Sequence, residues 1–374
     1  MTEQSDHNTE PSVEVYVATH KKIDFEIPDY CKKIQVNAER NGQWEGYLHD
    51  NDNPDNISLK NPNYCELTAL YAMWKNCDAD IQGLCHYRRY FSKFDDMQDK
   101  NQNDYWSLGV TYSEVVKSSV TKQNIIHELE HHDIILPYPN INTLDISVEE
   151  FFEAYVELKD IRAIHKVLEE YYPDYLPALF HALEVNHYSA CNMLIARRKL
   201  IDDYCTWLFD VLSKVEDRIS FDGDDEEHAR TYGYLSEILM NTYVHRHNLK
   251  CKFFSRIVTS QHAGIKRMLK KIPGLRWSFR LLHKRLTTES LKETNNFSIH
   301  IIRMFIERQH CFIARFTPKN EDNLLVNLEE AMNELKAEAS RENRTFLPQI
   351  VLSKEAPESL RKSLWDSGVR ILEG

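Results

Sequence analysis

The chain has 374 residues, of which 42% are hydrophobic and 28% charged, and its formal net charge at pH 7 is −12. This composition is typical of a soluble protein with two or three domains. No stretch approaches the roughly 20 apolar residues of a membrane span, and the polar N-terminus lacks an apolar signal core, so we expect a cytoplasmic protein. The cysteines are scattered without a C-x-x-C pair, which indicates reduced core residues rather than a disulfide framework. They are Cys31, Cys65, Cys77, Cys85, Cys191, Cys205, Cys251 and Cys311.

Strands and helices alternate over most of the chain. Val13–Thr19 alternates in the manner of a strand, and the apolar run Ile81–Cys85 has the length of a buried strand. Asn61 and Pro62 open a helix in which apolar and aromatic residues recur as far as Trp74. This alternation favours a mainly parallel sheet with helices on both faces. Further strands are predicted at 34–36, 133–136 and 192–196, and further helices at 122–130, 151–172, 200–215 and 227–245.

The C-terminal part of the chain follows a different pattern. A basic tract from Lys250 to Thr287 contains eleven Lys and Arg and no Asp or Glu. After it, two strands over 298–316, a helix over 323–339 and two apolar runs at 347–352 and 369–372 predict a small α/β module. We therefore expect four parts in the chain. They are a disordered tail at 1–12, a domain at 13–254, a basic amphipathic segment at 255–288 and a module at 289–374.

The strand at Ile81–Cys85 is followed directly by His86, Tyr87, Arg88, Arg89 and Tyr90. In open α/β sheets, ligands bind at the carboxyl ends of the strands. Arginine has a planar fork that matches pairs of phosphate oxygens. We interpret this cluster as the anion-binding floor of an active site. The alternative is a strand end capped by surface arginines.

Three patterns raise the question of a metal site. His127–His131 matches the H-E-x-x-H motif of zinc peptidases, but Pro137 prevents a long helix and no third ligand has a familiar spacing, so a solvated helix end is favoured. Asp78–Asp80 matches a D-x-D metal clamp but precedes the strand, which indicates a turn. The loop Asp222–Asp225 is the better candidate, because hard oxygen ligands suit Mg²⁺ or Mn²⁺. The alternative is a solvated acidic loop.

The predicted helix at 227–245 places Arg230, Tyr234 and Glu237 near one face. A carboxylate beside an arginine suits a positioned general base, and it suits a structural ion pair equally well.

The basic tract has the pattern of an amphipathic helix. Apolar residues recur every three or four positions from Ile265 to Leu286, and Lys and Arg fill the positions between them. Such a helix suits binding in the plane of an anionic membrane. We expect residues 255–286 to dock the protein on the inner face of the cell membrane. The alternative is a helix packed on the core; nucleic acid is not expected, since no recognition motif accompanies the charge.

In the blocks around Asn61 and His86, the chain resembles a bacterial family of capsular or exopolysaccharide biosynthesis glycosyltransferases, long catalogued as a domain of unknown function. The most specific blocks are Gly83–Phe91, with the letters HYRRYF, and Asn61–Thr68. The resemblance covers about 13 to 255 and leaves 290–374 outside it. The other matching stretches are Tyr16–Lys22, Asp55–Ser58, Tyr71–Asn76, Asp133–Pro137, Asn192–Met193 and Arg230–Leu239.

The resemblance implies a GT-A-like fold and the transfer of a sugar, galactofuranose in some members, from a UDP-sugar to a lipid-linked oligosaccharide. Capsule, exopolysaccharide or O-antigen synthesis would be the pathway. Where a GT-A enzyme carries D-x-D, this chain carries His86–Arg89, so fixed cations would stabilise the departing diphosphate. Glu237 is the expected catalytic base, with Asp225 as runner-up. The expected donor-binding residues are Thr19, His20, Lys21, Asn56, His86, Tyr87, Arg88, Arg89 and Arg230.

Two points stay open at this stage. No cofactor is certain, and Mg²⁺ or Mn²⁺ is one alternative. A non-catalytic module that holds a nucleotide or a polysaccharide is the alternative to an enzyme, and release of UDP from a UDP-sugar discriminates between the two.

Overall fold

The computed structural model describes residues 10–94, 107–141, 147–219, 229–260, 288–306, 309–320 and 323–373. Contacts divide the chain into two compact units. Three predictions concern residues that are wholly or largely outside the described ones. They are the tail at 1–12, the basic segment at 255–288, and Asp225. The first unit comprises Met1–Thr143, Pro177–Lys214 and Phe221–Arg267, and the second comprises Leu144–Leu176, Val215–Ser220 and Met268–Gly374.

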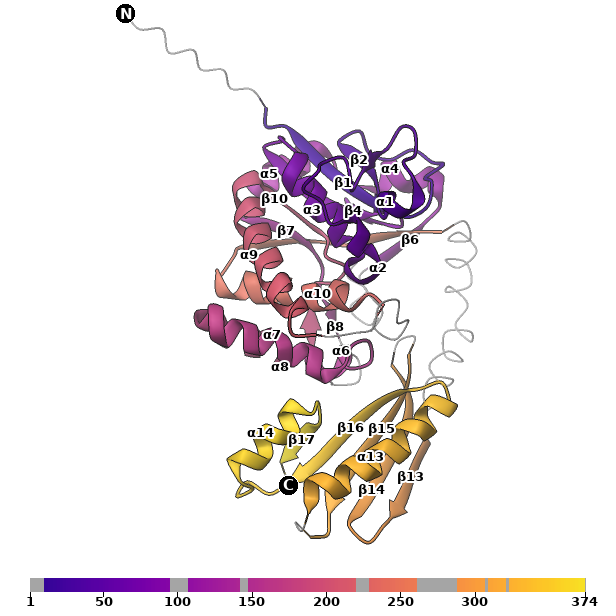
Figure 1. The fold of residues 1–374 in the computed structure, drawn as a ribbon. Helices are drawn as coiled ribbons and strands as arrows, with labels where there is room; N and C mark the ends of the chain where they lie inside the picture. The colour runs from indigo at the N-terminus through magenta and orange to yellow at the C-terminus, as the bar shows by residue number, and fades with distance from the viewer. Residues whose placement is uncertain are drawn as a thin grey trace, which may run out of the picture. The chain divides into compact units, whose positions relative to one another are not determined.

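A large, mostly parallel sheet forms the first unit (Figure 1). Its main path has the order β11-β7-β10-β4-β1-β2-β3. β1 pairs in parallel with β2 and β4, whereas β10 runs antiparallel between β4 and β7. The predicted mainly parallel sheet is therefore confirmed. The strands are β1 (Val13–Thr19), β2 (Cys31–Gln35), β3 (Leu48–His49), β4 (Ile81–His86), β7 (Ile134–Pro137), β10 (Leu194–Arg197) and β11 (Cys251–Phe254).

Three short strands extend this sheet beside the end of β4. They are β5 (Arg89–Phe91), β6 (Ser107–Val110) and β12 (Arg256–Thr259). β12 pairs antiparallel with β5 and parallel with β6. The sequence prediction placed residues 256–259 in the membrane-docking segment, and for these residues it is wrong, because they are a strand of the main sheet. A separate antiparallel pair, β8 (Asn140–Ile141) and β9 (His187–Tyr188), completes the strands of this unit.

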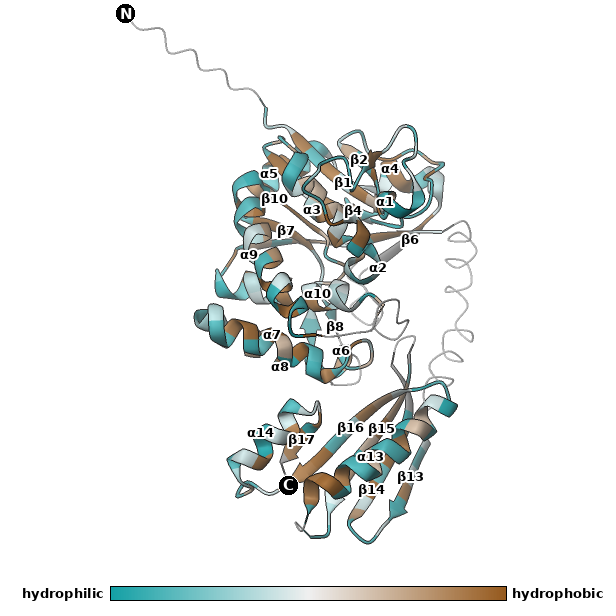
Figure 2. Cartoon of the chain, in the orientation of Figure 1, coloured by the Kyte–Doolittle hydropathy of each residue, from teal (hydrophilic) through white to brown (hydrophobic). Residues whose placement is uncertain are grey.

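Helices cover both faces of the sheet, as predicted. Val15 and Val17 of β1 point to the face of the sheet that α4 and α5 cover. These two valines form one buried core with residues of both helices and with Ile195 of β10. On the other face, α3 contacts β1 and β4, and aromatic contacts join α3 to α9. Figure 2 shows hydrophobic strands beneath helices with hydrophilic outer faces. The longer helices of the unit are α3 (Leu67–Asn76), α5 (Lys122–Leu129), α8 (Leu176–Glu184), α9 (Arg198–Glu216) and α10 (Thr231–Arg246).

Shorter helical turns connect these elements. They are α1 (Ala38–Asn41), η1 (Ser58–Lys60), α2 (Asn61–Tyr64), η2 (Tyr112–Glu114) and α4 (Val115–Ser118).

Gly83 allows β10 to lie against β4. A Cβ atom at this position would lie 2.7 Å from the carbonyl oxygen of Leu194 and 2.7 Å from Cγ1 of Ile195. Both neighbours belong to β10, and one is backbone, so no side-chain rotation would relieve the clash. Glycine at this point of β4 is therefore a packing requirement of the sheet.

The second unit contains the predicted C-terminal α/β module. Its sheet has the order β13-β14-β15-β16-β17, and α13 packs on a core that includes Phe297, Phe312 and Phe316. The elements are β13 (Thr288–Glu293), β14 (Phe297–Ile306), β15 (Gln309–Pro318), α13 (Leu324–Arg341), β16 (Thr345–Leu352), α14 (Glu358–Asp366) and β17 (Arg370–Glu373).

The second unit also includes a segment from the middle of the chain. This segment contains α6 (Val148–Phe152), α7 (Leu158–Tyr171) and η3 (Pro173–Tyr175). Arg370 of β17 pairs with Glu149 at 3.1 Å and with Glu153. Arg162 donates to the carbonyl oxygen of Val369 at 3.3 Å and stacks over Trp365, 4.5 Å from its centroid. The predicted boundaries at 13–254 and 289–374 stay a prediction, but residues 148–175 pack with the C-terminal module.

Candidate active site

The candidate site lies at the carboxyl ends of β1 and β4. The chain runs from β1 outward to β2 and β3, and then returns through α3 to β4 on the other side of β1. The backbone N–H of Tyr87 donates to the carbonyl oxygen of Ala18 at 3.1 Å, which joins the two strand ends. Ligands of open α/β sheets bind at such a switch point. The topology therefore places the HYRRYF block where a ligand is expected.

A tight turn between β4 and β5 separates the side chains of this block. His86 pairs with Arg89 across the turn, and Tyr87 and Arg88 form its tip. Nε2 of His86 lies 2.6 Å from the carbonyl oxygen of Cys191, so this nitrogen donates the hydrogen bond. Burial lowers the pKa of His86 against the opposing effect of Glu66. A neutral imidazole bonded in this way keeps Nδ1 as an acceptor.

Cys191 and Asn192 form a left-handed turn that connects three parts of the site. Their φ angles are 73° and 49°, in a region that residues other than glycine seldom adopt. The Cys191 carbonyl accepts from His86, and its backbone also hydrogen-bonds to Glu237. Nδ2 of Asn192 donates to Oε1 of Glu66 at 2.9 Å. Strained backbone concentrates at functional sites, and here it holds two carboxylates and an imidazole.

The carboxyl group of Glu237, on α10, has a pKa that suits a general base. Its carboxyl group has a pKa raised to about 7, first by burial and then by the charge of Glu66. The Cys191 backbone, Arg89 and Arg256 oppose this rise. A pKa near neutrality is what a general base needs at physiological pH. The predicted base therefore has a suitable environment, while its role stays a prediction.

The Asn61–Thr68 block brings Glu66 close to α10. A Cβ atom on Gly233 would lie 3.3 Å from both Cβ and Sγ of Cys65, so glycine permits this close approach of the helix. Cys65 has φ 52° and ψ −127°, another strained conformation. Glu66, the residue after it, begins α3 at its N-cap position. Glu66 is therefore a carboxylate of the site that the sequence analysis did not select.

Arg88 and Arg89 have different surroundings. Arg88 is exposed and lies over the ring of Tyr87, 5.0 Å from its centroid. Arg89 is partly buried; Cys191 raises its pKa, burial opposes this, and Glu66 and Glu237 add to the rise. Within the described residues, neither guanidinium forms an ion pair. Both forks are therefore available to an anionic ligand.

Other predicted donor-binding residues lie near the tip of the turn. The ring of His20 contacts Tyr87 edge-on at 5.1 Å. Burial lowers the pKa of His20, and the charges of Lys21, Arg88 and Arg230 lower it further. Arg230, at the N-cap of α10, lies 5.3 Å from the centroid of Tyr234. The structure thus brings His20 within electrostatic reach of three cationic residues, Lys21, Arg88 and Arg230.

Two predicted donor-binding residues are engaged in their own loops. Thr19 is 1% exposed; its hydroxyl accepts from the N–H of Lys21 at 3.1 Å and donates to the carbonyl of the same residue. Nδ2 of Asn56 donates to the carbonyl of Asn53 at 2.8 Å, and its Oδ1 accepts from the N–H of Ser58. Both residues shape loops near the strand ends, and direct contact of either with a donor stays a prediction.

Arg256 is a further site residue that the sequence analysis missed. Its side chain is 4% exposed, and it donates to Sγ of Cys191 at 3.3 Å and to Oδ1 of Asn140. The sequence analysis counted it with the basic tract. The β-branched run Ile257–Thr259 that follows it was the signal of a strand.

The two other motifs that resemble metal sites, Asp78–Asp80 and His127–His131, lie away from the candidate site. Asp80 accepts from the N–H and the hydroxyl of Ser12 at 2.9 and 2.7 Å, which confirms the turn before β4. His127, Glu130 and His131 place ligand atoms within 4.8 Å of one another, but all three are exposed at the end of α5. Glu128, which would be the peptidase base, pairs instead with Lys252 at 3.1 Å. These side chains lie at an exposed helix end, as expected, and the absence of a metal there stays a prediction.

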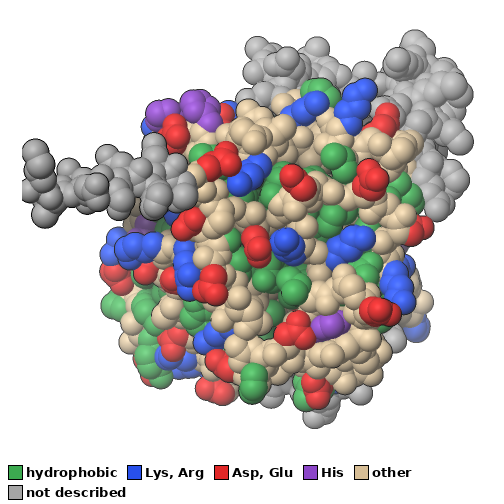
Figure 3. Space-filling model, turned by 90° about the horizontal axis from the view of Figure 1, so that it is seen from above, with side chains coloured by type: hydrophobic (Ala, Val, Ile, Leu, Met, Phe, Trp, Pro, Cys, Tyr) green, Lys and Arg blue, Asp and Glu red, His purple; other side chains and the backbone are tan. Residues whose placement is uncertain are grey.

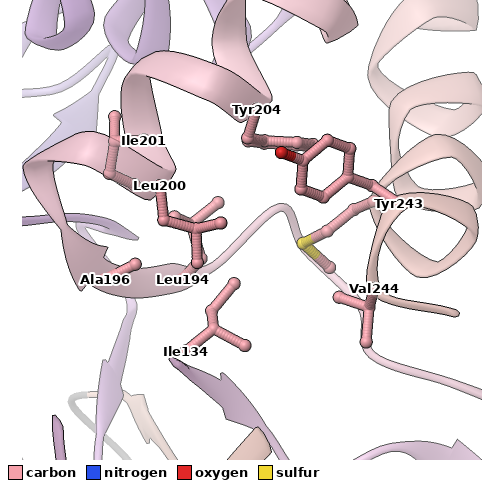
Figure 4. Close-up of a pocket in the computed structure, with 9 residues that line it drawn as sticks. Ile134, Leu194, Ala196, Leu200, Ile201, Tyr204, Tyr243 and Val244 are labelled. Atoms are coloured by element: carbon pink, nitrogen blue, oxygen red, sulfur yellow. The ribbon is translucent and has the colours of Figure 1, made fainter. Parts of the chain in front are cut away.

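A small cavity lies away from these groups (Figure 4). It occupies about 10 Å³, enough for roughly one water molecule. Only apolar and aromatic residues of β7, β10, α9 and α10 line it, with Tyr204 and Tyr243 at one side. It cannot hold a sugar nucleotide, so the strand ends are the better candidate for ligand binding.

The distribution of charge on one face of the molecule does not indicate a further ligand site. On the face shown in Figure 3, acidic and basic side chains are interspersed. Within the described residues, every helix is too short or too polar to cross a membrane.

Comparisons with known proteins identify the family of the chain and one similar solved structure. A domain family described as a domain of unknown function, DUF4422, matches residues 14–248. A solved structure titled as the apo form of the bifunctional glycosyltransferase WbbM is 29% identical, with a TM-score of 0.59. The match covers 67% of this chain and 45% of that one, so the chain matches less than half of that protein. No curated protein matches the chain.

Proposed function

The chain belongs to the DUF4422 family, and from this premise we propose that it is a glycosyltransferase that transfers a sugar from a UDP-sugar to a glycan acceptor. The likeness to a glycosyltransferase structure over 67% of the chain supports this proposal. The observation that carries it is the closeness, in one site, of Arg89, which forms no ion pair within the described residues, to Glu237, a buried carboxyl whose pKa is raised to about 7. Glycosyl transfer to a hydroxyl needs both functions at once.

The cations would receive the donor diphosphate. Arg88 and Arg89 present forks that match phosphate oxygens in pairs, and Arg230, His20 and Lys21 surround the same turn. When the bond between the anomeric carbon and the diphosphate breaks, UDP leaves with additional negative charge. Fixed cations stabilise that charge without reorganisation. The HYRRYF block would therefore stabilise the leaving group, UDP.

Glu237 would accept the proton of the acceptor hydroxyl. As the acceptor oxygen bonds to the anomeric carbon, its proton moves to the carboxylate. A base of pKa about 7 is largely ionised just above neutrality and still holds a proton well. General-base catalysis of this kind contributes roughly 10²- to 10⁴-fold.

A divalent cation does not fit the described part of this site. The position where a GT-A enzyme has its metal clamp is occupied by His86–Arg89, in which the charges of Arg88 and Arg89 repel a cation. The acidic loop Asp222–Asp225, the predicted place for Mg²⁺ or Mn²⁺, lies outside the described residues. The proposed steps therefore use side chains alone.

The finer parts of the proposal concern donor and acceptor. We propose a galactofuranose-type donor and a lipid-linked oligosaccharide in capsule, exopolysaccharide or O-antigen synthesis, on the resemblance of the HYRRYF and Asn61–Thr68 blocks. The basic residues at 261–286, which lie outside the described part of the chain, would bring the enzyme to the anionic inner leaflet of the membrane.

A donor screen tests the function. Purified protein is mixed with a panel of UDP-sugars and a bacterial membrane-lipid extract, and release of UDP is measured with and without the extract. The proposal predicts extract-dependent release with at least one donor. UDP binding without turnover for any donor would favour the non-catalytic module instead.

A further inference from the structure

Glu66 occupies a central position in the site without an assigned role. Its side chain and that of His86 are each 12% exposed, and its Oε1 lies 3.9 Å from Nε2 of His86. The same oxygen accepts a hydrogen bond of 2.9 Å from Nδ2 of Asn192. Two elements far apart in the sequence, the start of α3 and the turn before β10, are thus joined through this one carboxylate.

Asn192 extends this connection to α10. Its Nδ2 also donates to the carbonyl oxygen of Gly233 at 3.0 Å, and its Oδ1 accepts from the hydroxyl of Ser236 at 3.0 Å. Glu237 is the next residue of the helix, and it hydrogen-bonds to the backbone of Cys191. Consecutive residues of one strained turn therefore hold Glu66 and Glu237.

We propose that Glu66 is a positioning residue for the transfer reaction: it fixes the Cys191–Asn192 turn and, as the second carboxylate, keeps Glu237 basic enough to accept a proton. This inference rests on the proposed function, because it gives Glu237 the role of base. A second negative charge in a poorly solvated site opposes the ionisation of Glu237 and so strengthens it as a proton acceptor.

The other groups around Glu237 act in both directions. Arg89 from β5 and Arg256 from β12 favour its ionised form, whereas burial and, after it, the charge of Glu66 favour its protonated form. Glu66 offsets them, which is why its charge matters as well as its hydrogen bond. The remaining titratable groups that interact with Glu237 are Cys65, Cys191 and Tyr234.

The test is a direct titration of Glu237 that does not depend on activity. The carboxyl carbons of ¹³C-glutamate-labelled full-length protein are followed by NMR between pH 4 and 9, and Glu237→Gln identifies the signal. Glu66→Gln retains an oxygen that accepts from Asn192 but removes the charge. We expect this variant to lower the proton affinity of Glu237 by at least about threefold. An unchanged midpoint would overturn the proposal.

Two further variants separate charge from structure. Glu66→Asp retains the charge, and we expect it to restore a midpoint near that of the wild type, even if the Glu66→Gln protein folds poorly. A loss as large as that in Glu66→Gln would contradict the proposal. Glu184→Gln, at an exposed position of α8, is the matched control and should leave the midpoint unchanged.

The outcomes distinguish this inference from the proposed function. If no donor is turned over but the Glu237 midpoint falls in Glu66→Gln, the coupling stands and glycosyl transfer fails. If transfer occurs and its pH profile is the same in wild type and Glu66→Gln, the role of Glu66 fails and the function stands.

Discussion

The carbonyl oxygen of Cys191 accepts a hydrogen bond of 2.6 Å from Nε2 of His86. This bond joins the end of β4 to the turn before β10, two segments that lie more than a hundred residues apart in the sequence. It sets the orientation of the imidazole and, since burial lowers the pKa of His86, it leaves Nδ1 as an acceptor at neutral pH. In the proposed reaction, His86 is therefore a neutral group beside the cations, suited to orient a hydroxyl or a phosphate oxygen that carries a proton.

Arg88→Lys and Arg89→Lys should each weaken UDP binding by at least about tenfold. Lysine keeps the charge but loses the planar fork, and a charge-assisted hydrogen bond is worth about 1.5 to 3 kcal/mol. Isothermal titration with UDP measures the effect. Arg198→Lys is the matched control, because Arg198 is an exposed arginine that pairs with Asp78 beyond the amino end of β4. Affinities within twofold of wild type in both variants would remove these residues from the diphosphate site.

Glu237→Gln should lower turnover by roughly 10²- to 10⁴-fold while UDP binding stays within about twofold. The wild-type rate should rise with pH and level off above about 7, because the base must be ionised and its pKa is raised to about 7. A steady-state pH profile with saturating donor measures this limb. A rate that is flat from pH 5 to 8 would assign the base to another residue, with Asp225 as the next candidate.

The same substitution should stabilise the protein at alkaline pH. The pKa of Glu237 is higher in the folded state than the ordinary 4.5 of a glutamate, so the stability that this group contributes is complete below pH 4.5 and is lost as pH rises through 7. Glutamine avoids that loss. Urea unfolding at pH 8 should show Glu237→Gln more stable than wild type by roughly 1 to 3 kcal/mol, and the difference should vanish near pH 4. A less stable variant at pH 8 would contradict the raised pKa.

Arg370→Ala should destabilise the second unit by about 3 to 5 kcal/mol. Glu153, 5% exposed, and Glu149 both pair with Arg370, and removing the guanidinium leaves buried carboxylates without a cation. Lys292→Ala is the control, since Lys292 and Glu334 form an exposed pair worth less than about 1 kcal/mol. Urea unfolding measures both. Equal, small effects would mean that the α6–α7 segment does not depend on β17.

Membrane docking predicts that the full-length protein floats with vesicles rich in anionic lipid and is largely released by high salt, because screening weakens surface attraction. Replacing Lys266, Lys270 and Lys271 by glutamine should weaken flotation. The control replaces Lys336, Lys354 and Lys362 of the C-terminal module in the same way. If both variants and the wild type stay in solution with anionic vesicles at low salt, the basic tract has another role.

The local elements of the fold could be predicted because their signals are local. β1 has the predicted bounds, β4 differs by one residue, and α10 contains the predicted Glu237. Hydrophobic periodicity and the strand-end rule sufficed for these. The strand at 256–259 was missed because the count of basic residues outweighed the short β-branched run that follows Arg256.

The rest of the site depends on contacts that no local pattern contains. The left-handed conformation of Cys191 is one that cysteine rarely adopts. The partnership of Glu66 with Asn192 spans 126 residues. In the same way, the packing of residues 148–175 on β17 joins segments on either side of the basic tract. Such non-local pairs appear only once the chain is folded.

Sugar transfer by the purified enzyme tests the central claim most directly. Wild type and Glu237→Gln are incubated with a UDP-sugar and a lipid-linked acceptor, and the glycosylated product is measured by mass spectrometry. We predict a product one sugar heavier with wild type, and at least about a hundredfold less with Glu237→Gln at equal UDP binding. Absence of product from wild type with every donor of the panel, or equal yields from the two proteins, would contradict the account.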